Sequence, residues 1–168
     1  CVPVVVAAWL AGVTVVTHES DIIMGQANRL IAKMADKVLT GFPIQNYPYV
    51  AADKLVEVGI PLRAEFCVTK QPHHLKRPMV LVTGGSGGAA PIGQAILAIL
   101  PQLLHSADVM HICGDSMVKL CESAKASLDP DLKDHYAYLE YTDEMADYMR
   151  EATVVVTLGS SQIFEIAS

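Results

Sequence analysis

The turn at residues 79–89 constrains the fold more than any other part of this 168-residue chain. An apolar run at 79–83, which predicts a buried strand, ends in four glycines around Ser86 and leads directly into a helix-like segment at 90–104. A strand that turns straight into a helix is typical of parallel α/β sheets. Because the first N–H groups of a helix are unpaired and its dipole is positive there, the turn predicts a ligand that carries a diphosphate.

The rest of the chain alternates strand and helix in the same way. We expect strands at 13–17, 37–40, 55–58, 79–83, 108–112, 136–141 and 153–157, and helices at 3–11, 26–35, 90–104, 116–126, 143–150 and from 162 onward. This alternation predicts parallel sheets with helices on both faces, whose ligands bind beyond the carboxyl ends of the strands. Three loops that each follow a strand are therefore candidate binding loops, at 18–25, 83–89 and 157–162.

The composition excludes several classes of protein. Hydrophobic residues make up 52% of the chain and charged residues 18%, which indicates a globular chain that forms a core. A net charge of −6, with no stripe of lysine and arginine, argues against nucleic acid as a partner. The four cysteines form no C-x-x-C pair and no histidines have zinc spacing, so we expect neither disulfides nor a metal, as in a reducing cytoplasm.

The chain also carries signs of its organisation. Residues 2–16 are almost all apolar but too few to cross a bilayer, and Pro3 and Gly12 suit the start and the end of a helix. A polar, proline-bearing stretch predicts a linker at 69–76, between a first domain at 1–68 and a second at 77–168. The chain has no initiator Met and its last helical pattern stops early, from which we expect a piece of a longer protein.

Each candidate motif also has an alternative interpretation. The pattern Gly85-x-Gly87-x-x-Ala90 satisfies a loose dinucleotide fingerprint, but Asp115, the nearest acidic residue after the next strand, comes late, so NAD binding ranks low. The same glycines could simply serve a tight turn. Glu165 would lie in the first turn of the last helix, where it either binds vicinal hydroxyls of a sugar or only complements the helix dipole.

Two further polar groups leave the same choice open. The polar run at 18–21 follows a buried strand, and it either binds a sugar or phosphate or forms a solvated loop that caps the next helix. Arg63 follows a proline-stiffened turn, and it either pairs with a phosphate or carboxylate or lies at the surface.

Six motifs occur in register along the chain. They are a Pro-Val-x-x-Ala-Ala helix at 3–8, a His-Glu loop at 18–21 followed by Gly25 and Asn28-Arg29, a Gly-x-Pro-x-Arg turn at 59–63, a Gly-Gly-Ser-x-Gly-Ala loop at 84–89, an aromatic-x-Asp-acidic-Met segment at 141–145, and a Gly-Ser turn with a downstream glutamate at 159–165. In this order they resemble the bacterial MurG family, glycosyltransferase family 28, over essentially the whole chain.

The resemblance implies the GT-B fold, two Rossmann-like parallel-sheet domains that face each other across a cleft, both truncated here. It implies an enzyme of peptidoglycan biosynthesis that transfers N-acetylglucosamine (GlcNAc) from UDP-GlcNAc to lipid I, giving lipid II with inversion. It implies no cofactor and no metal, a peripheral place on the cytoplasmic face of the cell membrane, where lipid I resides, and room for partners among the cell-wall synthesis proteins.

The resemblance also implies residue roles. Residues that would bind UDP-GlcNAc are Arg63, Gly85, Ser86, Thr142, Ser160, Ser161, Gln162 and Glu165. Residues that would line the cleft near the sugar and the acceptor are His18, Glu19, Asp21 and Asn28. In this assignment Ser86 and Arg63 serve the diphosphate, the backbone at Thr142 contacts the uracil, and Glu165 binds the ribose.

The chain departs from the family pattern in two respects. Many relatives have Ser-Arg-x-Gly before the second turn, whereas this chain has Thr157-Leu158-Gly159 and lacks that positive charge. The catalytic base is expected upstream of Cys1, so we expect the chain to be inactive alone. A related family 28 enzyme that glycosylates a glycolipid, or a non-catalytic nucleotide-binding module, remains as an alternative.

Overall fold

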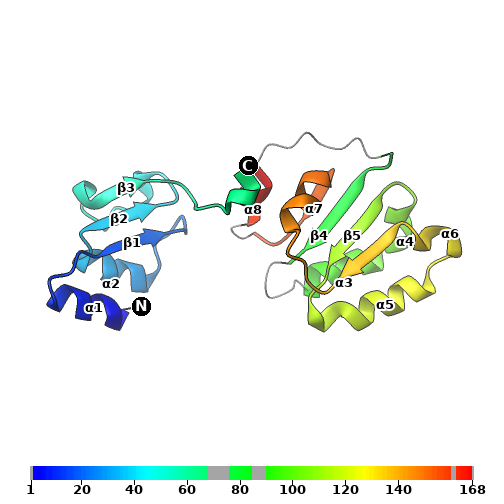
Figure 1. Ribbon diagram of the computed structural model, residues 1–168, viewed down its shortest axis with the longest axis horizontal. Helices are drawn as coiled ribbons and strands as arrows, with labels where there is room; N and C mark the ends of the chain where they lie inside the picture. Colours follow the sequence, from blue (N-terminus) through cyan, green and yellow to red (C-terminus); the bar gives the residue numbers. More distant parts are fainter. Residues whose placement is uncertain (1, 68–75, 85–89, 160–161, 168) are drawn as a thin grey trace. The chain divides into compact units, whose positions relative to one another are not determined.

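The computed structural model describes residues 2–67, 76–84, 90–159 and 162–167 (Figure 1). The chain divides into two compact units, Cys1–Pro61 and Leu62–Ser168. Each unit is built around a sheet in which every described strand pair is parallel, and this confirms the α/β class predicted from the alternating pattern.

The helices and strands occur in the predicted order. In the first unit they are α1 (Val2–Leu10), β1 (Val16–Glu19), α2 (Gln26–Met34), β2 (Lys37–Thr40) and β3 (Leu55–Glu57), with short 3₁₀ turns at Ile44–Asn46 and Ala52–Lys54. In the second unit they are a 3₁₀ turn at Ala64–Cys67, β4 (Met79–Thr83), α3 (Ala90–Ala98), α4 (Leu100–Leu104), β5 (Asp108–Ile112), a 3₁₀ turn at Asp115–Met117, α5 (Val118–Ser127), α6 (Pro130–Lys133), β6 (Tyr136–Leu139), α7 (Met145–Glu151), β7 (Val154–Val156) and α8 (Gln162–Ala167).

The sheet of the first unit has the order β1-β2-β3. Val38, in the central strand, is fully buried and belongs to a core with Val15, Met24 and Ala32. Helix α1 ends at Leu10, one residue before the expected end, and Gly12 lies just past it with a φ of 68° that lets the chain leave the helix. The N–H of Gly12 reaches the carbonyl of Trp9, and the N–H of Val13 reaches that of Ala8, so the last carbonyls of the helix are paired.

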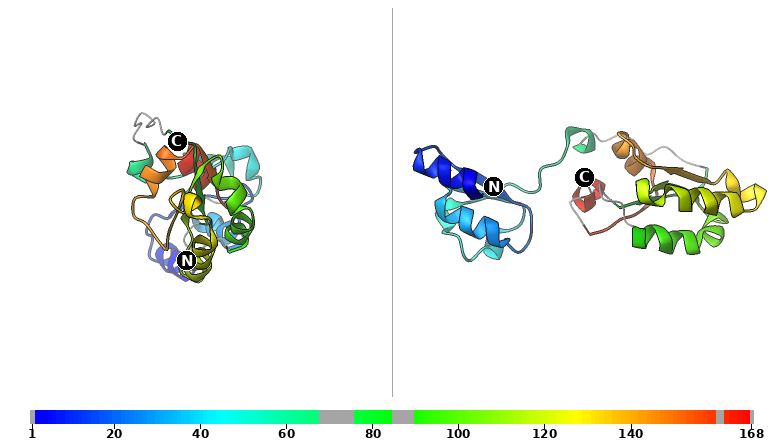
Figure 2. Two further views of the ribbon diagram at one scale, coloured as in Figure 1. Left: turned by 90° about the vertical axis from the view of Figure 1, so that its right-hand side faces the viewer. Right: turned by 90° about the horizontal axis from the view of Figure 1, so that it is seen from below.

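The sheet of the second unit has the order β6-β5-β4-β7 and carries helices on both faces (Figures 1 and 2). Alternate residues of β4 point to opposite faces, as the pleat requires. Val80 and Val82 belong to the core under α3, α4 and α5. Leu81, fully buried, belongs to the opposite core with Phe66 and with Met149 of α7.

Several expectations differ from the structure. The first strand lies at 16–19 and not at 13–17, so His18 and Glu19 are its last residues and not part of the following loop. The helix expected at 90–104 is interrupted at Ile99, because Pro101 has no N–H for a helix that would continue from α3 and instead lies in the first turn of α4. Helix α6, which Pro130 begins, was not expected.

The compact units divide between Pro61 and Leu62, earlier than the expected first-domain end at residue 68. The reason is Phe66, only 6% exposed, which packs against Leu81 and Ile112 of the second unit. Most of the expected linker, 69–76, falls outside the described residues. Within the described ranges, none of the helices has the length and apolarity of a membrane span.

Candidate functional site

A cavity of about 220 Å³ opens in the second unit where three parallel strands end. Thr83 closes β4, Ile112 closes β5, and Glu140 follows the last residue of β6; all three line the cavity, together with Gly114. Strand order places these ends side by side, because β4 pairs with β5 and β5 with β6. The cavity therefore lies at the edge where the alternating pattern predicted a ligand.

The remaining lining residues follow β6 or begin α8, except for Arg63, which precedes β4 in the sequence. They are Tyr141, Thr142, Met145, Gln162 and Arg63. Three of them, Thr142, Gln162 and Arg63, belong to the set expected from sequence to bind a sugar nucleotide. Of the other lining residues, Tyr141 and Met145 belong to the motif at 141–145 and Thr83 to the candidate loop at 83–89, but none of the three was given a role. Ile112, Gly114 and Glu140 were not singled out by sequence reasoning.

Arg63 is held by several contacts at this cavity. One terminal nitrogen lies 2.8 Å from a carboxylate oxygen of Glu65, and its Nε lies 3.6 Å from Oε1 of Glu165. The guanidinium also sits over the ring of Phe66, 4.7 Å from the ring centroid. The structure thus brings together Arg63, which was expected to bind the diphosphate, and Glu165, which was expected to bind the ribose.

The turn that carries Arg63 is fastened to α7. Phe66 is buried against Ala146 and Met149 of that helix. On the outside, Arg150 donates a hydrogen bond of 2.8 Å to the backbone carbonyl of Glu65 and pairs with Asp147 one turn earlier. Arg63 therefore reaches the cavity from a turn that is anchored on both sides.

The second Gly-Ser turn is only partly described. Thr157 directly follows β7, and its hydroxyl donates to Oε1 of Gln162, 2.8 Å away. Gln162 begins α8 and lines the cavity. Four residues of the expected set, Gly85, Ser86, Ser160 and Ser161, lie outside the described residues.

The segment 141–144 forms one rim of the cavity. The hydroxyl of Thr142 accepts the N–H of Glu144 at 3.0 Å, just before α7 begins. Tyr141, 72% exposed, donates its hydroxyl to Asp143 at 2.9 Å, and this hydrogen bond to a carboxylate raises the pKa of Tyr141. The Thr142 side chain is thus used locally, and the expected contact between its backbone and a ligand stays a prediction.

The expected cleft residues of the first unit also come together. Glu19 is 3% exposed, and its carboxylate accepts hydrogen bonds from the N–H groups of Asp21 and Gly25 and from the amide of Asn28, at 3.0 to 3.2 Å. Because both of its oxygens are engaged inside the protein, Glu19 shapes the loop at 20–25. Asp21 remains exposed at the end of that arrangement.

His18 has both ring nitrogens engaged. Its Nε2 lies 3.0 Å from the carbonyl oxygen of Gly59, and its Nδ1 lies 3.1 Å from the hydroxyl of Ser20. A carbonyl oxygen can only accept, so Nε2 carries the hydrogen of that bond. In this arrangement His18 ties the end of β1 to the turn at Gly59, whose φ is 80°.

Three titratable groups in the core of the second unit, His111, Cys113 and Tyr136, have strongly perturbed pKa values, and none of them lines the cavity. His111 is 2% exposed, and burial lowers its pKa to about 4. Its Nδ1 lies 3.3 Å from the hydroxyl of Tyr136 and 3.5 Å from the sulfur of Cys121. Burial likewise raises the pKa of the Cys113 thiol to about 12. Among the described residues, no cluster of three or more histidine, cysteine or acidic side chains could hold a metal.

Two units, each built around a parallel sheet and one with a cavity at the carboxyl edge of its sheet, fit the GT-B fold of glycosyltransferases, truncated in this chain. The model of the glycosyltransferase family 28 C-terminal domain matches residues 79–168, and that of the family's N-terminal domain matches residues 1–40. The chain belongs to glycosyltransferase family 28, as the motifs in the sequence indicated.

Relatives of known name support the same family. Two of them, from Geobacillus kaustophilus and Clostridium tetani, bear the name UDP-N-acetylglucosamine–N-acetylmuramyl-(pentapeptide) pyrophosphoryl-undecaprenol N-acetylglucosamine transferase. They are 35% and 33% identical to 99% and 98% of this chain, which spans 47% and 46% of their lengths. The crystal structure of Acinetobacter baumannii MurG matches 93% of the chain and 43% of its own, with a TM-score of 0.67 and 25% identity. The chain therefore spans about half the length of these relatives.

Proposed function

We propose that this chain carries the donor site, and part of the acceptor side, of an enzyme that transfers GlcNAc from UDP-GlcNAc to lipid I, giving lipid II in peptidoglycan biosynthesis. The observation that carries the proposal is the meeting of Arg63 and Glu165 beside a cavity at the carboxyl edge of the second sheet. The names of the relatives, which specify this donor sugar and an undecaprenol-linked acceptor, support the choice of substrates.

The cavity suits one part of the donor. Sites for whole small ligands usually measure about 300–1,000 Å³, whereas this cavity measures about 220 Å³. We assign it to the uracil end of UDP-GlcNAc, against the backbone at Thr142 and the side chain of Gln162. Glu165 then accepts hydrogen bonds from the ribose hydroxyls, and Arg63 meets the diphosphate. Gly85, Ser86, Ser160 and Ser161 complete the assignment from sequence.

The chemistry is an inverting displacement. A hydroxyl of the acceptor sugar attacks the anomeric carbon of GlcNAc, the bond to the diphosphate breaks, and UDP leaves with the electron pair. Negative charge grows on the diphosphate as that bond breaks, and fixed positive groups aimed at it lower the barrier. In this chain those groups are the guanidinium of Arg63 and the N–H groups at the start of the helix that follows the glycine-rich turn. No residue of the chain is assigned as the base.

The polar group of the first unit would serve the sugar and the acceptor. His18, Glu19 and Asn28 are joined by hydrogen bonds, and this network holds the loop at 20–25. We assign Glu19 and His18 to positioning, because their polar atoms are engaged within the protein, and Asp21 to direct contact, because it is exposed. Since lipid I is a membrane lipid, we infer that the enzyme sits peripherally on the cytoplasmic face of the cell membrane.

Calorimetric titration of the 168-residue chain with UDP-GlcNAc, UDP-glucose and NAD tests the donor site. We expect saturable binding of UDP-GlcNAc that Glu165→Ala and Ser86→Ala both weaken. The matched control is Glu122→Ala, which removes an exposed carboxylate from α5 and should leave binding unchanged. A preference for NAD would contradict the proposal, and so would absence of UDP-sugar binding by the folded chain. A preference for UDP-glucose would favour a different donor within the family.

A further inference from the structure

In the structure, Arg63, which lines the cavity, forms an ion pair with Glu165 beside it. The Nε of Arg63 lies 3.6 Å from Oε1 of Glu165, and the two side chains are 57% and 16% exposed. Arg63 comes from the segment before the turn Ala64–Cys67, and Glu165 from α8, so the ion pair joins two segments that are far apart in the sequence. Both belong to the same compact unit.

These are the two side chains that the proposed function assigns to different parts of one ligand, and the inference rests on that assignment. A ribose needs the Glu165 carboxylate as an acceptor for its hydroxyls, while a diphosphate needs the Arg63 guanidinium. When a ligand that carries both parts separates the pair, its ribose replaces Arg63 as the partner of Glu165 and its diphosphate replaces Glu165 as the partner of Arg63. A nucleoside without phosphate binds Glu165 but offers Arg63 no group to replace the Glu165 carboxylate.

We propose that the Arg63–Glu165 ion pair makes the site discriminate against nucleosides that lack phosphate. Specificity is a difference between two affinities, and it can come from a cost imposed on the wrong ligand as well as from contacts to the right one. Here the cost is the loss of the ion pair. A ligand with a diphosphate does not incur this cost, because its phosphate oxygens replace the Glu165 carboxylate as the partner of Arg63. An arginine can bind a phosphate through two parallel hydrogen bonds.

The surroundings of Arg63 set the size of this effect. Glu65 holds the guanidinium from the other side at 2.8 Å and remains its partner whether or not Glu165 is engaged. More than half of the Arg63 side chain is exposed, so solvent screens its pairing with Glu165. We therefore expect a discrimination of a few-fold from this pair alone, and not of several orders of magnitude.

The test compares uridine with UDP. The variant Arg63→Met keeps the length of the side chain and removes its charge. For UDP we expect the affinity to fall by at least about tenfold, because a charged hydrogen-bond donor is lost. For uridine we expect the affinity to rise by about two- to fivefold, because Glu165 no longer has to leave the ion pair. A residue with a purely structural role would lower both affinities.

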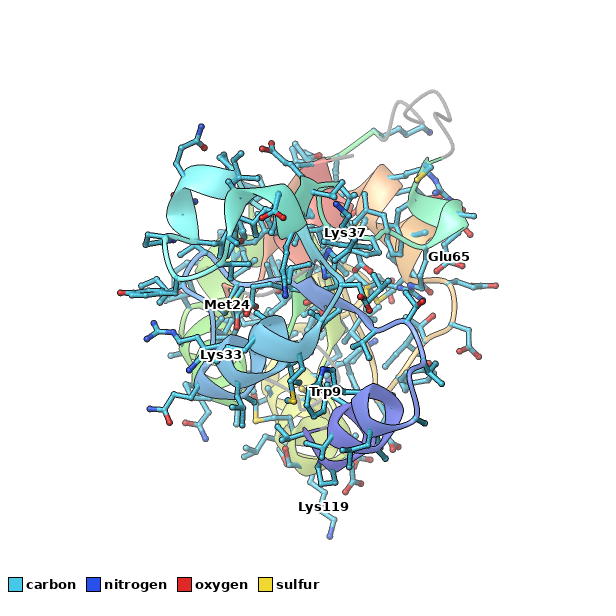
Figure 3. All side chains as sticks on the ribbon, turned by 90° about the vertical axis from the view of Figure 1, so that its left-hand side faces the viewer. Trp9, Met24, Lys33, Lys37, Glu65 and Lys119 are labelled. Carbon is cyan, nitrogen blue, oxygen red and sulfur yellow. The ribbon has the colours of Figure 1, made fainter. Side chains whose placement is uncertain are left out.

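Lys119→Met is the matched control, because it removes one positive charge from the same unit at a side chain that extends into solvent (Figure 3). It should change neither affinity. The double variant Arg63→Met with Glu165→Gln shows whether any gain for uridine passes through Glu165. We expect the gain to disappear in the Glu165→Gln background.

The outcomes separate this inference from the function on which it rests. If UDP binds, and Arg63→Met binds uridine no better than the unsubstituted chain does, the donor site stands and the discrimination by the ion pair is overturned. The same holds if the gain for uridine persists without the Glu165 carboxylate. If the folded chain binds neither uridine nor UDP, the proposed function fails and the inference fails with it. Thermal unfolding of each variant confirms that the chain being titrated is folded.

Discussion

Arg150 donates a hydrogen bond to the backbone carbonyl of Glu65 across 85 residues of chain, with 2.8 Å between nitrogen and oxygen. The contact fastens the turn Ala64–Cys67 to α7. Since Arg63 immediately precedes that turn, we expect Arg150 to position the Arg63 guanidinium at the cavity without touching a ligand itself. Arg150 would in this sense be a positioning residue for the proposed donor site.

Replacing Arg150 by alanine should loosen the turn and weaken UDP binding. We expect a loss of affinity of about three- to tenfold, which corresponds to roughly 0.7–1.4 kcal/mol, measured by calorimetric titration. The control is Asp147→Asn, which removes the ion pair of Arg150 within α7 but leaves the bond to the Glu65 carbonyl possible. Equal losses in the two variants would mean that the ion pair, and not the bond to the turn, positions Arg63.

The Glu19 carboxylate should be indispensable to the first unit. It accepts hydrogen bonds from Asp21, Gly25 and Asn28 while almost fully buried. In Glu19→Gln an NH₂ group replaces one accepting oxygen and faces a donor, and a buried donor without an acceptor costs about 1–3 kcal/mol. Urea unfolding followed by the fluorescence of Trp9, the only tryptophan of the chain and an exposed residue of α1 (Figure 3), reports on this unit. Glu57→Gln, at an exposed position of β3, should have little effect.

Phe66 should stabilise the second unit although it lies outside the expected second domain at 77–168. It packs against Leu81 and Ile112, and deleting a buried phenylalanine side chain typically costs about 3–5 kcal/mol. Phe66→Ala should therefore lower the urea midpoint of the second unit, followed by circular dichroism, without shifting the Trp9 transition of the first. Phe66→Leu, which keeps part of the apolar side chain, should lower the urea midpoint by less than Phe66→Ala. A shift of the Trp9 transition alone would place the segment with the first unit instead.

The parts of the fold that were predictable are those governed by periodicity. Buried β-branched runs such as the one at 79–83 identified the central strands, and alternation with helices identified the parallel sheets. Element ends were less predictable. The β-branched run at 13–17 extends outside the strand because pairing with β2 begins only at Val16, opposite Lys37. The register in which two strands pair depends on contacts between them, and these contacts cannot be predicted from a single sequence.

The lining of the cavity was predictable where a residue follows a strand or fits a motif. Arg63, Thr142 and Gln162 were expected to bind a sugar nucleotide, and all three line the cavity, while their contact with such a ligand stays a prediction. The partnership of Arg150 with the Glu65 carbonyl was not predictable, because it depends on the backbone of a turn far away in the sequence. The engagement of both ring nitrogens of His18 was hidden for the same reason, since the carbonyl of Gly59 carries no sequence signal.

Buried His111 should make the second unit less stable as the pH falls. Its folded-state pKa of about 4 lies below the ordinary value of 6.5, so between these values the unfolded chain binds the proton and the folded chain does not. The contribution of neutral His111 to the free energy of unfolding is fully present above about pH 6.5 and decreases as the pH falls toward about 4, by an amount on the order of 3 kcal/mol.

Urea unfolding at pH 7 and pH 4.5, followed by circular dichroism, measures the difference in the free energy of unfolding. In His111→Gln the loss between the two pH values should be smaller, even if the variant is less stable at pH 7. The control His105→Gln, at an exposed position of the same unit, should keep the loss of the unsubstituted chain. An unchanged pH dependence in His111→Gln would show that other groups cause the acid sensitivity.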